Sequence, residues 1–275
     1  MARFDPIGCE MRVVIQTGTK RTLLDEVLSS RGEGVLRMSD DDSRLKQEFE
    51  KLLKQPDAPQ QIDQWMWSEL SSGSHSRKHP WNLAVYCSLA EDALHGLVPR
   101  SRTVVIRDVD VTQRSIDFYT DIRSEKVVSL RDRAASQRIC WTFYRHETRL
   151  QLRLDARAEL LPLDSVNEQW HRTPQHSRGA YASVDPPGTT LTQSSTHQHK
   201  ASVSIDPLSV SSASLGDVAI GRAVLQIEKA KDNFCVIRTI VDSVEMVHLA
   251  PDGNRRVHFV YDAEGRCDEV SWLVP

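Results

Sequence analysis

The stretch DFYTDIRSEKVVSL, residues 117–130, joins a strand to a helix and decides the fold. From Asp117 to Thr120, aromatic and β-branched residues stand side by side, as is typical of a strand. Ser124 suits a helix N-cap, and apolar residues recur after it at helical spacing. The sequence therefore predicts a strand that leads directly into a helix over residues 124–134.

Hydroxyl groups and cations gather at the predicted start of this helix. A helix N-terminus presents unpaired backbone N–H groups and the positive end of the helix dipole, so added cations and hydroxyls make it suitable for a phosphate. Ordinary capping with solvated cations is the alternative, and the local sequence leaves both interpretations open. The residues concerned are Tyr119, Thr120, Arg123, Ser124 and Lys126.

Composition narrows the class of protein. The 275 residues suffice for one large domain or two small ones, and the formal net charge of −3 offers no general attraction to nucleic acid. No apolar run is long enough to cross a bilayer, and no apolar signal core follows Met1, so we expect a cytoplasmic protein without membrane contact. The five cysteines form no closely spaced pair, which argues against a disulfide framework or a metal site, and we expect Cys87, Cys140 and Cys235 to be buried thiols.

The chain changes character along its length. Residues 1–60 are a polar leader with short helices, and residues 61–275 form the main domain, interrupted by a Ser/Thr/Pro-rich insertion at about 185–216. Strand patterns dominate this domain, and RLQLRLDARAEL alternates cleanly with Gln151 on its polar face. With one clear inserted helix, this pattern predicts a mainly β fold with flanking helices, an antiparallel barrel.

Several motifs in a fixed order extend this prediction. They are RTVVIR at 102–107, FYTDIRSEK at 118–126, a strand that carries the R-x-Q motif at 149–151, WHRTPQHSRGAYAS at 170–183, and the ending from Val244 onward. Together they resemble the pyridoxamine 5′-phosphate oxidase family, whose members are FMN-binding split β-barrels. The resemblance covers roughly residues 63–275 without the insertion, and it implies a diverged member of that family.

By this resemblance, the start of the predicted helix holds the phosphate of FMN. We call this place, residues 119–126, the helix mouth. In many family members a second arginine stands immediately before the lysine that corresponds to Lys126. Here that position is Glu125, and we expect Arg123, two residues earlier, to take the place of that arginine. Gln151 matches a glutamine that hydrogen-bonds the flavin, Phe234 replaces a tryptophan beside it, and His258 replaces an arginine. The implied cofactor-binding residues are Arg102, Thr103, Val104, Val105, Arg107, Tyr119, Thr120, Arg123, Ser124, Lys126, Gln151, Phe234 and His258.

The substrate half departs further from the family pattern. The four positions that hold the substrate phosphate read Arg107, Gln169, Thr173 and Ser177, of which Arg107 keeps the charge and Ser177 is unchanged. A C-terminal motif that orients the substrate is also altered, at 254–258. The expected function is an FMN-dependent oxidoreductase that transfers hydride from a small substrate, for example a phosphorylated B6 vitamer. The alternatives are a non-catalytic flavin-binding protein and a barrel that has lost its flavin.

The resemblance also implies assembly. In the family the flavin lies in a cleft between two subunits, so we expect a homodimer with a shared flavin site. Strands such as ICWTFY, residues 139–144, carry apolar residues on both faces, which one barrel does not cover. The alternative is that the leader covers this surface within one chain through Leu45, Phe49, Leu52 and Leu53.

Overall fold

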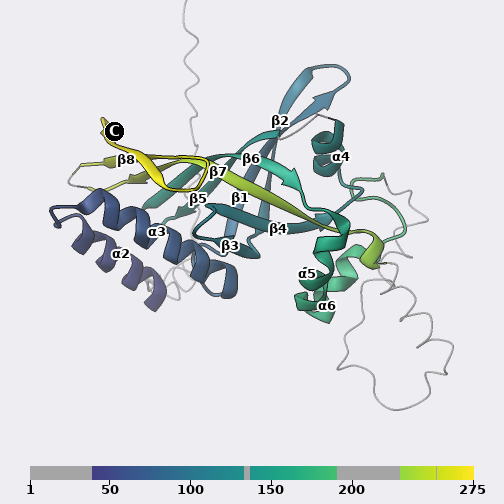
Figure 1. The fold of residues 1–275 in the computed structure, drawn as a ribbon, viewed down its shortest axis with the longest axis horizontal. Coiled ribbons are helices and arrows are strands. Elements are labelled where there is room, and N and C mark those ends of the chain that lie inside the picture. Colours follow the sequence, from purple (N-terminus) through teal and green to yellow (C-terminus); the bar gives the residue numbers. More distant parts are fainter. Residues whose placement is uncertain (1–38, 133–136, 191–229, 252) are drawn as a thin grey trace, which may run out of the picture. The chain divides into compact units, whose positions relative to one another are not determined.

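The computed structural model describes residues 39–132, 137–190, 230–251 and 253–275. Two helices, α2 (Asp40–Leu52) and α3 (Ala58–His75), precede a nine-stranded antiparallel sheet with the strand order β2-β1-β5-β6-β7-β4-β3, which β8 and β9 extend from β7 (Figure 1). The strands are β1 (Leu83–Asp92), β2 (Gly96–Val105), β3 (Asp108–Asp110), β4 (Ser115–Asp121), β5 (Gln137–Arg145), β6 (Leu150–Leu160), β7 (Phe234–His248), β8 (Arg255–Tyr261) and β9 (Cys267–Leu273). The remaining helices are α4 (Glu125–Asp132), α5 (Asn167–Arg172) and α6 (Gln175–Arg178), with the 3₁₀ turns Leu163–Val166 and Gly179–Tyr181. The mainly β architecture with flanking helices confirms the predicted fold class.

Strand β7 is the central strand of the sheet and pairs with three other strands. It pairs with β4 and β6 along its first part and with β6 and β8 along its second, so it connects both ends of the fold. On β6, the predicted alternation is confirmed, because Leu150, Leu152 and Leu154 are fully buried while Gln151 lies on the opposite face. The two ends of β7 therefore mark two distinct regions in which side chains can meet.

The helices α2 and α3 belong to the same compact unit as the sheet. Helix α3 buries Ile62, Met66 and Leu70 at helical spacing, so one face of it packs into the core. Helix α2 buries Leu45 and Phe49, and Phe49 packs edge-on against His248 at the end of β7. The compact unit consequently runs from Asp40 to Pro275, whereas the sequence suggested a leader up to residue 60.

The expected burial of three cysteines is confirmed only in part. Cys235 is buried as expected, but Cys87 and Cys140 are only partly buried, because they face each other on the outer surface of β1 and β5. Most of the Ser/Thr/Pro-rich insertion and the strand pattern at 224–229 lie outside the described residues.

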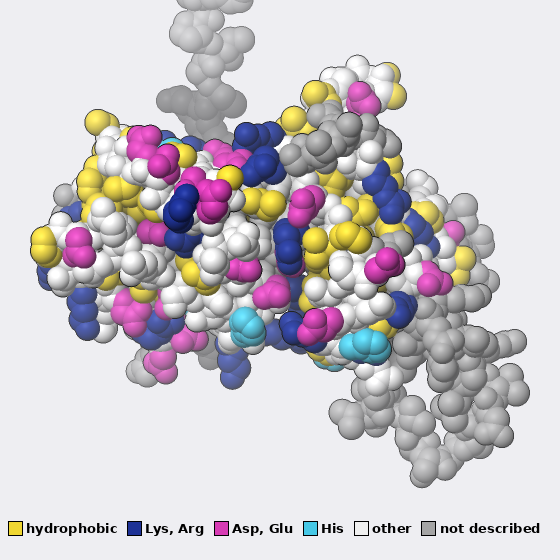
Figure 2. Space-filling model, viewed as in Figure 1, with side chains coloured by type: hydrophobic (Ala, Val, Ile, Leu, Met, Phe, Trp, Pro, Cys, Tyr) yellow, Lys and Arg dark blue, Asp and Glu magenta, His cyan; other side chains and the backbone are white. Residues whose placement is uncertain are grey.

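On the face seen in Figure 2, basic and acidic side chains are interspersed. Within the described parts of the chain, none of the helices combines the length and the apolar character needed to cross a membrane.

Candidate functional site

The predicted strand-to-helix junction forms as expected at the end of β4. Helix α4 begins at Glu125, and the backbone N–H groups of Val127 and Val128 both donate to the Ser124 carbonyl, 2.9 and 3.1 Å away. Lys126 reaches back across this first turn, and its Nζ donates to Thr120 Oγ1 at 2.6 Å and to Ser124 Oγ at 3.1 Å. The junction therefore holds a cation and two hydroxyls at the positive end of a helix.

A second cation arrives from β2. The Arg102 side chain is mostly buried, its Nη2 lies 3.6 Å from Glu125, and its Nη1 is buried without a hydrogen-bond partner among the described residues. Burial, and after it the positive charge of Arg102, lowers the pKa of Lys126 to about 8. The two positive charges repel each other, and Arg102 has a buried N–H group without a hydrogen-bond partner among the described residues. A bound anion offsets the repulsion and accepts that hydrogen bond.

The geometry therefore fits the phosphate of FMN. The donors on hand are the Arg102 guanidinium, the Lys126 ammonium and the hydroxyls of Thr120 and Ser124, all suited to phosphate oxygens. These four residues were predicted from sequence, and the structure brings them together.

Two hydroxyls nearby were not predicted. Tyr86 Oη and Ser88 Oγ lie on β1, on the strand face that carries Arg102, and both are buried without a hydrogen-bond partner in the described chain. Arg102 lies over the Tyr86 ring, 6.0 Å from its centroid, and burial raises the pKa of Tyr86 to about 12. Only the register Tyr86↔Arg102 reveals this contact, because nothing in the local sequence of β1 resembles a phosphate motif.

The guanidinium group of Arg123 binds other groups of the chain. Its guanidinium pairs with Asp121 at 2.8 Å and donates to the carbonyls of Ser183 and Val184, both at 3.0 Å. Its expected role as a substitute phosphate ligand remains a prediction, because most of its donors already bind the chain. Glu125 lies 3.5 Å from Arg100 and 3.6 Å from Arg102, so the carboxylate that the sequence placed against the phosphate is partly balanced.

Tyr119 connects the helix mouth to an aromatic cluster and a cavity. Arg107 lies 5.7 Å from the centre of the Tyr119 ring, and Phe234 packs against that ring at 5.0 Å. Phe234 is almost fully buried and also contacts Trp170 and Tyr181. It thus lies beside the predicted region, but it belongs to a packed cluster.

A cavity of about 290 Å³ opens beside Tyr119. Predicted residues Arg107 and Thr173 line it, together with Arg77 and Arg172, which sequence reasoning missed. Arg77 follows α3 and Arg172 ends α5, so no single motif contains them. Gln169 Oε1 is buried without a described partner, and Ser177 lies on α6 and does not line the cavity.

The remaining predicted cofactor residues lie at two places. Thr103, Val104 and Val105 continue β2, the edge strand of the sheet, directly after Arg102. Gln151 pairs with Val247, and His258 pairs with Glu245, both near the far end of β7.

The distance between these places is large. The helix mouth joins β7 at its first residues, where Thr120 pairs with Cys235, whereas Gln151 pairs near its last. At about 3.3 Å per residue, the two points are about 40 Å apart along the strand. FMN is much shorter than this, so one chain does not bring Gln151 to its own phosphate site.

Comparison with known proteins points to the same cofactor. Residues 64–162 match the family model described as pyridoxamine 5′-phosphate oxidase, FMN-binding domain. The chain is 27% identical, over 150 residues, to pyridoxine/pyridoxamine 5′-phosphate oxidase 2 of Arabidopsis thaliana, covering 52% of this chain and 74% of that protein.

Two solved structures share the fold at 18% identity. A pyridoxamine 5′-phosphate oxidase-related, FMN-binding protein from Nostoc punctiforme superposes with a TM-score of 0.53, covering 78% of this chain and 97% of that one. PhzG from Burkholderia lata, solved with tetrahydrophenazine-1-carboxylic acid, gives the same TM-score over 82% and 96%. Residues 64–162 therefore match the FMN-binding domain of pyridoxamine 5′-phosphate oxidases, and the described chain shares the fold of the two solved structures.

Proposed function

We propose that this protein is an FMN-dependent oxidoreductase that acts on a small anionic substrate and holds the FMN phosphate at the mouth of α4. The observation that carries the proposal is the pair Arg102 and Lys126, two mostly buried cations beside the first turn of a helix. FMN, when bound, supplies the hydride acceptor of the reaction. The chain binds the phosphate, excludes water from it and orients the substrate.

The direct test is the cofactor and its reaction. Purified protein is expected to be yellow, with the absorbance bands of oxidised flavin, and to consume oxygen with an accepted substrate. Protein that binds FMN without any oxygen consumption across small anionic amines and alcohols supports the second candidate, a non-catalytic flavin-binding protein. That candidate is favoured by one observation, the replacement of substrate-binding positions by Gln169 and Thr173.

The cavity beside Tyr119 is the proposed substrate site. Arg77, Arg107 and Arg172 line it, against the single carboxylate of Asp108 among its described lining residues. An excess of guanidinium groups selects a phosphate or carboxylate. The relative PhzG is solved with a carboxylic acid, which is consistent with such a substrate.

Ordinary pyridoxamine phosphate oxidation is expected to be slow. Two of the cations beside Tyr119, Arg77 and Arg172, come from other positions than the family pattern, and the orienting motif at 254–258 is changed, so we expect the substrate carbon to be misplaced against the flavin. We expect turnover of pyridoxine or pyridoxamine 5′-phosphate well below roughly 1 per second, measured as oxygen uptake by FMN-loaded protein. Turnover at or above that rate contradicts the inference drawn from the changed motif.

A second copy of the chain is proposed to complete each flavin site. Along β7, Gln151 lies about 40 Å and His258 about 33 Å from the phosphate site of their own chain, so in this proposal a partner supplies its own copies of them. The outer face of β1, β2 and β5 exposes apolar side chains suited to this contact. They include Leu83 at 54%, Leu97 at 52% and Tyr144 at 46% exposure, with Val85 and Leu89 between them. Helix α2 leaves these side chains exposed, so within the described residues the leader does not cover this face.

Light scattering tests this dimer. FMN-loaded protein is expected to have the mass of two chains, and Val85→Lys is expected to yield monomers that lose FMN, because a charge is placed in an apolar contact. Val111→Lys, an exposed valine outside this face, is the matched control and should remain dimeric. A wild-type mass of one chain at every concentration contradicts both the dimer and the shared site.

The affinity for FMN is expected to fall at alkaline pH. Lys126 without ligand has a pKa of about 8, and a bound phosphate raises that pKa, so the contribution of the charge is complete below pH 8 and is lost above it. The dissociation constant should rise by up to about tenfold per pH unit from pH 8 to 9, measured by flavin fluorescence. Lys126→Arg keeps its charge and should give a flat profile. Identical profiles for both proteins show that Lys126 is not the titrating group.

A further inference from the structure

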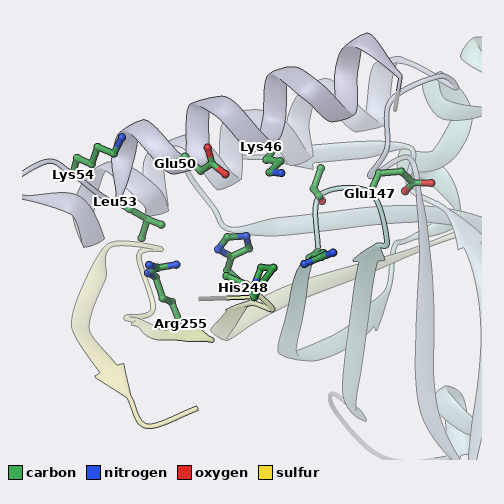
Figure 3. A pocket seen from close by; sticks show the side chains of 11 residues that line it. Lys46, Glu50, Leu53, Lys54, Glu147, His248 and Arg255 are labelled. Carbon is green, nitrogen blue, oxygen red and sulfur yellow. The ribbon is translucent and has the colours of Figure 1, made fainter. Parts of the chain in front are cut away.

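A second cavity lies between α2 and the far end of the sheet. It has a volume of about 530 Å³, within the range of small-molecule sites. Its residues come from α2 and the residues after it, the β5–β6 turn, the end of β7 and the start of β8 (Figure 3). Most of them lie outside residues 64–162, so the cavity is a feature that the matched family domain does not contain.

The wall formed by α2 is fixed in place. Arg145 at the end of β5 binds the buried carboxylate of Asp42 through two hydrogen bonds of 3.0 and 3.2 Å, and Phe49 packs between His248 and Trp65. Arg44 on the same helix forms a bidentate pair with the buried Glu69 of α3 at 2.7 and 2.8 Å. The cavity therefore has preformed walls.

Positive charge is in excess around this cavity. Lys46, Lys54, Arg149 and Arg255 line it, against the carboxylates of Glu50 and Glu147. Figure 3 shows Lys46 and Glu50 along α2 and Lys54 just beyond its end, above His248 and Arg255, while Glu147 points away from them. Glu147 also lies 3.5 Å from Arg145, which offsets its charge. Among the described residues, Lys46, Lys54 and Arg149 form no ion pair.

We propose that this cavity binds a small molecule that carries a phosphate group. The cations on three sides match the oxygens of a phosphate dianion, and the cavity is larger than phosphate alone. Leu53, Ala250 and Pro251 add apolar surface for an organic part. The site is distinct from both parts of the proposed flavin site. It lies about 40 Å along β7 from the mouth of α4 of its own chain, and His248 packs against Phe49 of α2 on the sheet face opposite to the one that carries Gln151.

Titration calorimetry of the full chain with phenyl phosphate tests this site, in the presence of saturating FMN. Binding is expected to persist with FMN present and to weaken about tenfold or more in Lys54→Ala and in Arg149→Ala, because each removes a charged hydrogen bond. Glu50→Gln should tighten binding several-fold, because it removes a carboxylate from the wall. Phenol, which lacks the phosphate, should not bind.

Two controls locate the site. Lys51→Ala removes the same charge from the exposed side of α2 and should leave binding unchanged. Arg107→Ala removes a cation from the proposed substrate cavity beside Tyr119, so it should leave unchanged the binding event that Lys54→Ala and Arg149→Ala weaken. The proposal is overturned by an absence of binding at millimolar phenyl phosphate, by displacement of the probe by FMN, or by equal weakening in Lys51→Ala. Weakening only in Arg107→Ala also overturns it, and that result places the probe in the substrate cavity. None of these outcomes depends on oxidoreductase activity.

Discussion

Lys126→Ala and Arg102→Ala proteins are each expected to lose FMN affinity by about 1.5–3 kcal/mol, the cost of removing a charged hydrogen bond to phosphate. Lys126 stands at the first turn of α4 and Arg102 reaches the same place from β2, so each loss removes a separate donor. The double variant should purify without flavin, because either change alone already weakens binding at least about tenfold. Fluorescence titration of flavin-free protein measures the constants.

Two further variants control this result. Arg131→Ala removes an exposed cation from the same helix and should leave FMN affinity within about twofold, since surface charges away from the ligand contribute little. Glu125→Gln should tighten binding, because its carboxylate lies 3.6 Å from Arg102 and opposes an incoming phosphate. Retention of full flavin by both Lys126→Ala and Arg102→Ala shows that the phosphate binds elsewhere.

Asp63→Ala is expected to destabilise the fold by about 3–5 kcal/mol, the usual cost of leaving a buried charge unpaired. Asp63 on α3 is buried, and it accepts hydrogen bonds from Tyr261 Oη at 2.6 Å and from Arg114 at 2.8 Å. Arg114 also donates to the Gly265 carbonyl and lies over the rings of Trp67 and Tyr261. One carboxylate thus joins α3 to β8 and to the turn before β4.

Urea unfolding measures this loss. Asp57→Ala, just before the same helix, removes an exposed carboxylate that accepts a hydrogen bond from Gln61, and it should cost less than about 1 kcal/mol. The double variant Asp63→Ala/Arg114→Met should recover part of the loss, because no unpaired guanidinium remains buried. A loss below about 1 kcal/mol in Asp63→Ala shows that water replaces the carboxylate and that the cluster does not fix α3.

Local patterns in the sequence determined the helix mouth and most of the sheet. Thr120, Ser124 and Lys126 lie within one strand end and one helix turn, so their meeting follows from short-range geometry alone. The alternation in β6 likewise needs only the two-residue period of a strand. The ordered motifs indicated a resemblance to one family, and residues 64–162 match the FMN-binding domain of that family.

Only the tertiary structure decided which distant residues join these groups. Tyr86 meets Arg102 through strand register, and Arg77, which follows α3, lines the same cavity as Arg172 at the end of α5. The cavity beneath α2 depends on how Asp42 and Phe49 anchor that helix. Such contacts arise from register and packing between elements far apart in the chain, and a one-residue shift of register turns every side chain of a strand to the other face. Local sequence patterns do not encode that choice.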